Sequence, residues 1–390
     1  MKILRIVFLS ILLVSHAAKV AASLSPDAVT LAHWIADRQF HNAALPGYGA
    51  IAGADGPAAI GDDGRQYYSV SPYSANLAVI ALLKSRMPNA LSVAEPWAGW
   101  YFAHLNRQSA PDGVPYNHFY RADGSGETTC VKPGNTFLCH YNDATDSAAA
   151  TFLSVLWAAH EAGLPDAFLK ASPRQQQVET LANLILKLQQ PDGLCAAKRD
   201  YRVRYLEDNS EVFAGLCAAA SLEKDVFENP QRSETYKKAA ENVRRGILVE
   251  LYDKNVGLFC VAKFENNDLP APNLHTWYPD SQAQLWPVLF GVISAHDPRA
   301  LTAAAGVNDH WNGKDQPDWA RDPSRVNQGW VEAGHACAAL LMGETNRVKT
   351  YINAVNRFKI ADPGSHPRFR SPFTVDDAGW LLRILATGRD

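Results

Sequence analysis

Six segments of the chain share one pattern, in which a polar and often acidic start is followed by a long apolar run. The segments begin at Ser71, Asn142, Glu207, Pro279, Asn327 and Val375. Their later turns are apolar on nearly every side, which predicts helices that are buried all round. Asn, Asp and Ser near the starts are residue types that cap helix N-termini.

Amphipathic segments alternate with these apolar runs, at 25–40, 91–107, 175–190, 233–252, 298–311 and 346–358. The amphipathic helices have one solvent-exposed face, and the apolar helices have none. This alternation predicts two concentric rings, with the amphipathic helices outside. We therefore expect an all-α fold, an (α/α)6 barrel of six helical hairpins with the apolar runs inside. An open α-solenoid is the alternative. Its repeats span about 34–47 residues, whereas the apolar segments here recur at roughly 50–70.

The N-terminus has the layout of a secretory signal peptide. Lys2 and Arg5 precede an apolar run at 6–14, and small residues at 20–22 form a cleavage site. The run is too short to span a bilayer, so we predict that 1–22 is removed and that the protein is secreted or periplasmic. An uncleaved anchor is the alternative. No linker or low-complexity tract divides 23–390, which we expect to be a single barrel domain.

Charge excludes some classes of partner. The chain has 37 Lys and Arg and 40 Asp and Glu. Cleavage would remove Lys2, Arg5 and Lys19, so 37 − 3 = 34 bases would face 40 acids, a net charge of −6. A mildly acidic protein is not expected to bind nucleic acid or an anionic membrane surface. No later segment resembles a membrane span.

The chain contains six cysteines, and an oxidising compartment permits disulfides. Cys130 and Cys139 flank a Pro-Gly-Asn turn, which predicts a bridge between them. Cys195 and Cys260 follow similar glycine-containing turns, which leaves a second bridge open. Cys217 and Cys337 lie in apolar helical runs and are expected to be buried thiols. There is no CxxC or HExxH motif, so we expect no metal and no cofactor.

The alternation of six apolar and six amphipathic helices resembles the six-hairpin glycosidase superfamily over essentially the whole mature chain. The resemblance is architectural and identifies no single glycosidase family. It implies that the N-terminal ends of the inner helices converge on one face and line a carbohydrate site. The pair Asp376-Asp377 is similar to the paired aspartates of some six-hairpin mannanases, although the surrounding residues do not match that family.

Acidic residues are concentrated at the starts of the apolar runs. Glycoside hydrolysis needs one carboxylic acid to protonate the leaving oxygen and a second carboxylate to activate water or attack the sugar. The catalytic candidates are Asp146, Glu211 and Asp377, followed by Asp143, Asp208, Asp280 and Glu332. We expect Asp146 and Glu211 to share a water-accessible cluster. Helix capping is the alternative for each acid, and it explains Asp208 and Asp376 best.

Aromatic and basic residues near the same starts are candidate sugar contacts. The aromatic candidates are Tyr73, Tyr141, Tyr205, Trp277, Tyr278, Trp330 and Trp380, because sugars stack on such rings and apolar-lined pockets are usual for ligands. Trp277 and Tyr278 are expected at the rim. Arg202, Arg204 and Arg370 could recognise an acidic sugar, and His275 is a further candidate. The alternatives are core packing for the rings and neutralisation of nearby acids for the arginines.

These features favour a glycoside hydrolase that acts on a polysaccharide or oligosaccharide. One alternative is a polysaccharide lyase, with His275, Tyr278 or His140 as the base. Another is a sugar epimerase or an isomerase/cyclase on the same barrel, which a deep, closed, His-rich or apolar pocket would favour. A third is a non-catalytic glycan-binding protein, whose rim acids would be paired in salt bridges or solvated.

Overall fold

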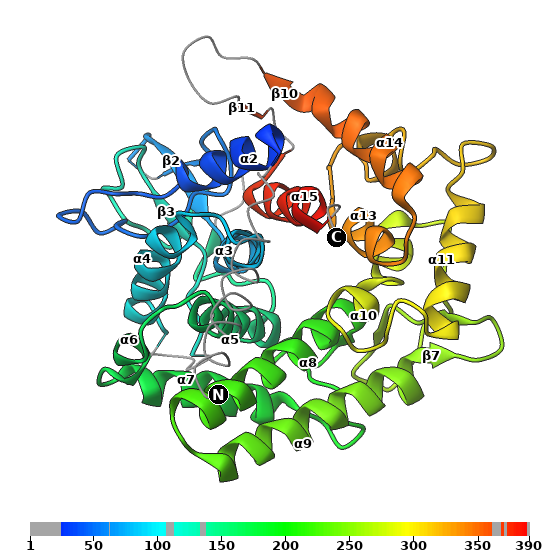
Figure 1. The fold of residues 1–390 in the computed structure, drawn as a ribbon, viewed down its shortest axis with the longest axis horizontal. Helices are drawn as coiled ribbons and strands as arrows, with labels where there is room; N and C mark the ends of the chain where they lie inside the picture. Colours follow the sequence, from blue (N-terminus) through cyan, green and yellow to red (C-terminus); the bar gives the residue numbers. More distant parts are fainter. Residues whose placement is uncertain are drawn as a thin grey trace, which may run out of the picture.

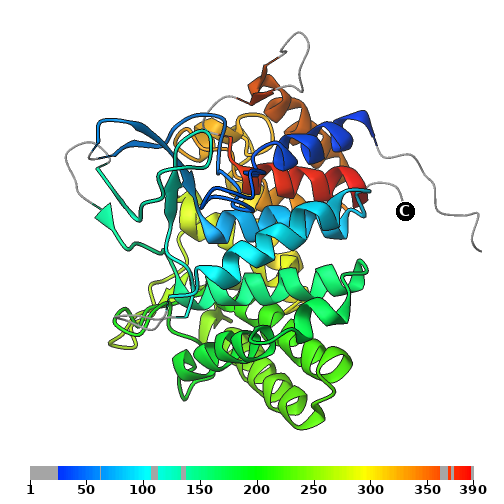
Figure 2. The same cartoon turned by 90° about the vertical axis from the view of Figure 1, so that its left-hand side faces the viewer.

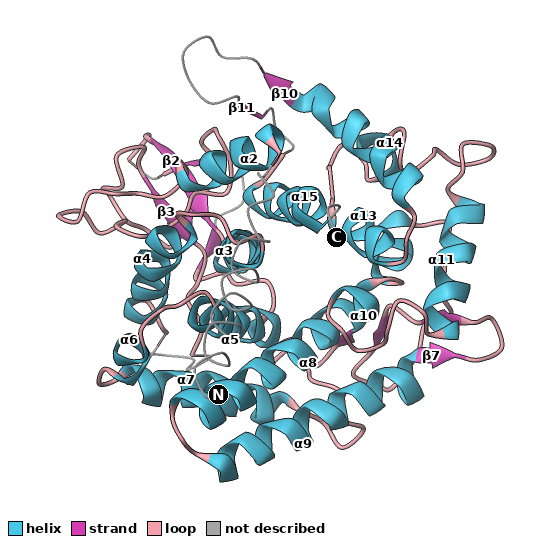
Figure 3. Ribbon diagram, in the orientation of Figure 1, coloured by secondary structure: helices cyan, strands magenta, loops and turns pink. Residues whose placement is uncertain are grey.

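The computed structural model describes residues 25–387, apart from 62, 107–112, 133–137, 361–367 and 370–372. The predicted signal peptide at 1–22 and Arg370 lie outside the described residues. Two rings of helices surround a common axis (Figure 1), and helices dominate throughout (Figure 3). The prediction of an all-α (α/α)6 barrel is confirmed.

The inner ring contains one helix from each apolar segment. Its members are α3 (Pro72–Lys84), α5 (Thr145–Glu161), α8 (Leu206–Ser221), α10 (Trp286–Leu289), α13 (Gly334–Leu341) and α15 (Val375–Thr387). The outer ring consists of α2 (Pro26–Ala36), α4 (Ala90–Ala103), α7 (Arg174–Leu188), α9 (Pro230–Gly246), α11 (Pro298–His310) and α14 (Thr345–Val355). Shorter pieces are α6 (Asp166–Lys170), α12 (Pro323–Val326), the π-helical turns η1 (Leu222–Val226), η2 (Ile247–Leu251) and η3 (Trp277–Ser281), and the 3₁₀ turn η4 (Asn356–Phe358).

The ring closes between its first and last hairpins. Helix α15 packs against both α2 and α3, as Figure 1 shows, and the Val375 amide donates to the Gly53 carbonyl. An open α-solenoid is therefore excluded. The inner helices approach closely where one of them has a glycine. A Cβ on Gly215 of α8 would lie 2.4 Å from the Ala150 Cα in α5, and one on Gly379 of α15 would lie 2.9 Å from the Ala78 Cα in α3.

Short strands lie in the loops between hairpins. An antiparallel sheet of order β1-β2-β3 joins β1 (Ala59–Ile60), β2 (Gln66–Val70) and β3 (His118–Tyr120). Two-stranded antiparallel pairs are β4 (Cys130–Val131) with β5 (Leu138–Cys139), β6 (Arg204–Tyr205) with β9 (Ala262–Lys263), β7 (Tyr252–Asp253) with β8 (Leu258–Phe259), and β10 (Lys359–Ile360) with β11 (Arg368–Phe369). Figure 2 shows the β1-β2-β3 sheet and long loops at one end of the barrel.

Two inner segments differ from the expected continuous helices. The run from Pro279 is divided into η3 and the short α10, which has Pro287 in its first turn. The run from Asn327 is not helical until Gly334, because Gln328 and Gly329 adopt positive φ angles of 48° and 105°. As a result, the inner helices α10 and α13 are short, and the backbone at the starts of their segments is irregular.

The predictions for the cysteines are confirmed in part. Cys130 and Cys139 lie opposite each other in β4 and β5 and are bonded, with an S–S distance of 2.07 Å, as predicted. Cys195 and Cys260 are free, so the second bridge is not formed. Cys337 is a buried thiol, but Cys217 is exposed, and the expectation that it is buried was wrong. Within the part of the chain that the structure describes, no helix is long and apolar enough to cross a membrane.

Candidate active site

A pocket of about 110 Å³ lies where the starts of the inner segments meet. All six segments contribute to it, because each presents its first turn or the loop before that turn. The lining residues are Tyr73, Leu77, Asp143, Ala144, Ser147, Glu207, Asp208, Tyr278, Gln282, Trp286, Glu332, Asp376 and Trp380. We call this site the acidic pocket, because its lining includes five carboxylates.

The five lining acids are Asp143, Glu207, Asp208, Glu332 and Asp376. Among the described residues, none of them forms an ion pair with a lysine, arginine or histidine. The described lining also includes no basic residue, although Lys198 lies over the Tyr141 ring close to Asp143. Several carboxylates therefore face one another in a confined space, where burial and like charge favour the protonated forms.

The pKa values of the lining acids follow from this crowding. Burial, and then the negative charge of Asp376, raises the pKa of Glu332 to about 8. Burial and the charge of Asp143 raise the pKa of Asp208 to about 7, against the opposing effect of Lys198. Burial raises the pKa of Glu207 as well, and the charges of Glu211, Glu332 and Asp208 add to this. Protonated carboxyl groups at neutral pH are thus expected in the pocket.

Glu211 lies directly behind the lining and is only 1% exposed. The Tyr73 hydroxyl and the Trp286 Nε1–H donate to its Oε1 at 2.6 and 3.2 Å, and the Ser147 hydroxyl contacts its Oε2. Burial, and then the charge of Asp208, raises the pKa of Glu211 to about 8. Tyr73, Ser147 and Trp286 all line the acidic pocket. Glu211 therefore holds three lining side chains in position.

Asp146 and Asp377 are also behind the lining. Asp146 is fully buried, and its Oδ1 accepts the Ser147 N–H at 2.8 Å. Asp377 accepts both the amide and the hydroxyl of Thr374, at 3.1 and 2.8 Å, which caps the start of α15. The expectation that Asp146 and Glu211 are water-accessible is therefore not met. Asp280 is half-buried outside the lining and accepts the Asn273 amide at 3.4 Å.

No protein-family model and no curated protein matches the sequence. The solved structures that it resembles include a wild-type glycosidase, with a TM-score of 0.59 and 12% identity over 92% of this chain and 95% of the other. An alpha-amylase from Clostridium perfringens gives 0.54 and 11%, over 92% and 97%. The GH63 mannosylglycerate hydrolase from Thermus thermophilus, in complex with glucose, gives 0.55 and 14%, over 92% and 100%. The chain therefore shares its fold with these solved structures.

The aromatic candidates divide between the pocket and its surroundings. Tyr73, Tyr278 and Trp380 line the pocket. Tyr141 is exposed and donates to Asp143 at 2.9 Å, and Tyr205 shares a hydrogen bond with Tyr201. Trp330 is exposed outside the lining. The expected rim position of Trp277 was wrong, because its side chain is buried against Trp311 and His335.

The basic candidates lie outside the lining of the pocket. Arg204 is buried and donates to Asp192 at 2.9 Å and to the Phe264 carbonyl, so it holds two loops together. Arg202 is exposed, and its backbone amide donates to Glu265. His275 is exposed, with its ring against that of His310 at 4.5 Å. In the described residues, none of these side chains is placed to recognise a ligand in the pocket.

Sequence reasoning did not select five polar or aromatic lining residues as site residues, namely Glu207, Asp376, Ser147, Gln282 and Trp286. A spacing of four residues could have pointed to four of these five, because residues four apart share one face of a predicted helix. The pairs with this spacing are Asp143 and Ser147, Tyr278 and Gln282, Gln282 and Trp286, and Asp376 and Trp380. Of these pairs, only Asp376 and Trp380 lie within one helix in the structure, and the spacing does not find Glu207.

Proposed function

We propose that the protein is a glycoside hydrolase that cleaves a neutral carbohydrate in the acidic pocket. The observation that carries this proposal is the convergence of five carboxylates and four aromatic rings on one confined site. Glycoside hydrolysis needs a protonated carboxyl group and an ionised one on the two sides of the scissile bond. The similarity of the fold to solved glycosidases supports the proposal.

Glu332 is the proposed general acid. It faces the pocket just before α13, and its Oε1 accepts the Gly334 amide at 3.3 Å. With a pKa raised to about 8 by burial and by Asp376, it holds a proton at neutral pH. A carboxyl group that is protonated at the working pH and faces the substrate can donate to the leaving oxygen.

Glu207 is the proposed ionised carboxylate. Burial raises the pKa of Glu207 most, and the charges of Glu211 and Glu332 raise it further, so Glu207 loses its proton more readily when those two groups are protonated. It also lies in the first turn of α8, where the helix dipole favours a negative charge. Glu207 would activate water or attack the sugar, and Glu332 would protonate the departing group.

The lining indicates a neutral substrate of small size. A uronic acid would bring a further negative charge to five carboxylates that have no basic partner in the described lining. A volume of about 110 Å³ is several times the roughly 10–15 Å³ that a cavity needs to admit one water, so the pocket has room for a small group only. We therefore propose that the enzyme binds the end of a neutral saccharide.

The alternative activities fit this pocket less well. A lyase would need a base and a cation for the uronate. Tyr278 lines the pocket, but the charge of Glu207 and burial raise its pKa far above the neutral range. An isomerase or epimerase was expected to have a His-rich or apolar pocket, whereas this described lining has five acids and no histidine. A glycan-binding protein was expected to have rim acids that are paired in salt bridges or solvated. These acids form no ion pair with described residues, and Glu207, Asp208, Glu332 and Asp376 are half-buried.

Secretion or export to the periplasm is part of the same proposal, and it rests on the signal-peptide pattern of residues 1–22 and on the Cys130–Cys139 disulfide. Disulfides persist in oxidising compartments outside the cytosol. N-terminal sequencing of the protein exported by its host would test it. A mature chain that begins at Ser23 is expected, and an intact Met1 would contradict the proposal.

The activity is tested with neutral oligosaccharides and polysaccharides, assayed by reducing ends, beside uronate polymers assayed by double-bond absorbance. We expect reducing ends from a neutral substrate and no new double bonds. Glu332→Gln and Glu207→Gln should each lower kcat by about 10²–10⁴. The control is Glu161→Gln, which alters a surface ion pair with Lys84. If both pocket variants keep parent activity on a proven substrate, the assignment of roles is wrong.

A further inference from the structure

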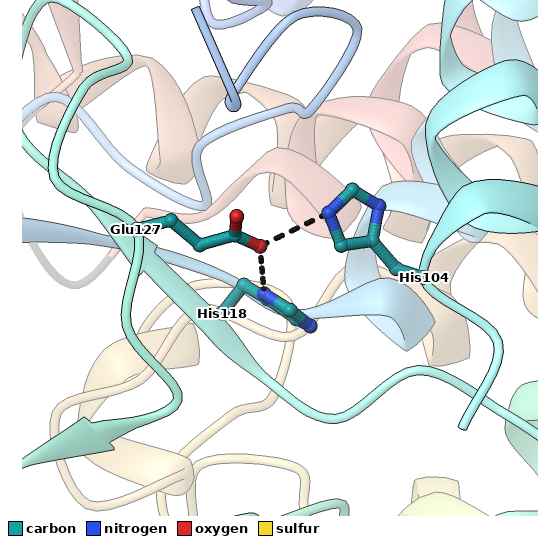
Figure 4. A group of neighbouring side chains, drawn as sticks. All are labelled: His104, His118 and Glu127. Atoms are coloured by element: carbon teal, nitrogen blue, oxygen red, sulfur yellow. Dashed lines mark ion pairs between the residues drawn. The ribbon is translucent and has the colours of Figure 1, made fainter. Parts of the chain in front are cut away.

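A second cluster of ionisable side chains lies outside the acidic pocket, between an outer helix and the three-stranded sheet. His104 directly follows α4, His118 begins β3, and Glu127 lies in the loop after β3. His104 Nε2 and His118 Nδ1 lie 3.0 and 2.8 Å from the same Glu127 oxygen, Oε1 (Figure 4). One ligand atom from each residue falls within 4.8 Å of the other two.

The tautomer of His104 follows from its second nitrogen. Its Nδ1 lies 2.7 Å from the Trp100 carbonyl oxygen, which can only accept, so Nδ1 carries the proton. In the neutral ring, Nε2 therefore presents a lone pair to the Glu127 carboxylate. Two acceptors at 3.0 Å repel each other unless a cation lies between them or the ring takes a second proton. Histidines that bind metals usually donate their other N–H to a carbonyl or carboxylate in this way.

Hydrogen bonds and ring contacts also hold the Glu127 carboxylate and both imidazole rings in position. The Tyr120 hydroxyl donates to Glu127 Oε1 at 2.9 Å and itself accepts the Trp100 Nε1–H at 3.0 Å. The Trp100 ring stacks on His104 at 4.3 Å and meets His118 edge-on at 5.2 Å. Trp100 thus orders both imidazoles and, through Tyr120, the carboxylate, so the site is ordered by groups that surround the three ligands.

The cluster is accessible to solvent on the side of the carboxylate. The side chain of Glu127 is 30% exposed, whereas those of the histidines are 17% and 9% exposed, so an ion can enter past the carboxylate.

We propose that His104 Nε2, His118 Nδ1 and the Glu127 carboxylate bind a divalent first-row transition-metal ion, and that zinc is the best match. Two imidazoles and one carboxylate are a common zinc ligand set, with water as the fourth ligand. The three residues are 14 and 9 positions apart in the chain, so no short motif reveals the site.

The position of the site points to a structural role. None of its three residues lines the acidic pocket, and the ion would join the end of α4 to the β1-β2-β3 sheet. The Asn117 amide, next to His118, donates to the Tyr141 carbonyl at 2.7 Å, and the Tyr141 hydroxyl donates to Asp143. Through these hydrogen bonds, the ion would stabilise the loop that contains Asp143. We expect it to raise thermal stability and to take no part in the chemistry.

The test uses untagged, chelator-treated mature protein and a calorimetric titration with zinc. We expect one zinc per chain, a higher Tm with zinc, and weaker binding as the pH falls, because protons compete for the histidines. His104→Gln and Glu127→Gln should abolish the one-to-one binding. Tyr120→Phe should weaken it by about 10- to 100-fold, as is usual for a group that orients a ligand. His296→Gln, an exposed histidine before α11, is the matched control and should bind as the parent does.

Two outcomes of the titration would overturn the inference. Parent protein that binds no zinc at one-to-one stoichiometry would show that the cluster is only an ion pair. Equal binding by the parent and His104→Gln would place the ion elsewhere. X-ray absorption at the zinc edge provides a measurement that needs no variant. Two imidazole nitrogens and carboxylate oxygen at about 2.0–2.2 Å are expected, and a shell of water oxygens alone would contradict the site.

Discussion

Replacement of Glu211 by glutamine should stabilise the protein at high pH, because the amide mimics the protonated carboxyl group. Glutamine keeps an oxygen that can accept from Tyr73 and Trp286, which both donate to Oε1. It places an NH₂ group where Oε2 meets the Ser147 hydroxyl, whose oxygen can accept. All three contacts therefore survive, and the only property lost is the ability to ionise inside the barrel.

The sign of the effect follows from the raised pKa. Burial and Asp208 raise the pKa of Glu211 from 4.5 to about 8. Between these values the folded protein holds a proton that the unfolded chain releases, so rising pH favours unfolding. The stabilising contribution is complete below about pH 4.5 and is lost as the pH rises through about 8. At about 1.36 kcal/mol per pH unit the ceiling is about 5 kcal/mol, and relaxation around the charge should reduce it to about 2–4 kcal/mol.

Urea unfolding of the parent and of Glu211→Gln at about pH 5 and about pH 8, without reductant, measures the effect. The variant should match the parent to within about 1 kcal/mol at the lower pH and exceed it by about 2–4 kcal/mol at the higher. The other acids with raised pKa values are present in both proteins, so their contributions cancel except for the part that the Glu211 charge adds at Asp146 and Glu207. Glu161→Gln, at an exposed ion pair, should show no such dependence on pH. Destabilisation of Glu211→Gln by equal amounts at both pH values would refute the reasoning.

Three further predictions concern other parts of the molecule. Hydrolysis should decline as the pH rises through about 8, because Glu332 then loses the proton that it donates, and a pH–rate profile with an unchanged alkaline limb in Glu332→Gln would contradict this role. Gly215→Ala should lower the free energy of unfolding by about 1–3 kcal/mol, since the added Cβ would lie 2.4 Å from the Ala150 Cα; an unchanged urea midpoint would show that the helices can separate. Denatured, unreduced protein should titrate four thiols, those of Cys195, Cys217, Cys260 and Cys337, whereas six would exclude the disulfide.

The two rings could be predicted because the relevant signal is long and repeated. Each hairpin contributes an apolar run and an amphipathic run, and the periodicity of each is set by burial over many residues. The caps add local evidence. Ser25 accepts the Ala28 amide and Ser71 accepts the Ser74 amide, each directly before a proline in the first turn. Errors at individual positions do not change such a pattern, so the architecture follows from the sequence.

The choice of acids could not be predicted in the same way. Successive residues of a helix differ by about 100° in direction, so neighbouring acids such as Asp376 and Asp377 face different surroundings. Asp376 lines the pocket, and Asp377 caps α15 through Thr374. The sequence Thr374-Val375-Asp376-Asp377 has the spacing of a capping box, which assigns the cap to Asp377. Without the orientation of α15 toward its neighbours, however, the face of Asp376 remained undetermined.

The two inner segments that departed most from helical expectation are also those that complete the pocket. Because α13 begins only at Gly334, Glu332 lies on irregular backbone and points into the pocket instead of packing on a helix face. A Cβ on Gly334 would lie 2.4 Å from the Trp286 ring, so the glycine lets Trp286 reach the wall that it shares with Glu332. In the neighbouring segment, the break between η3 and α10 brings Tyr278, Gln282 and Trp286 to one face of the site. Local rules of helix formation fail where the proposed chemistry requires other geometry. The breaks in the inner ring therefore support a functional role for the acidic pocket.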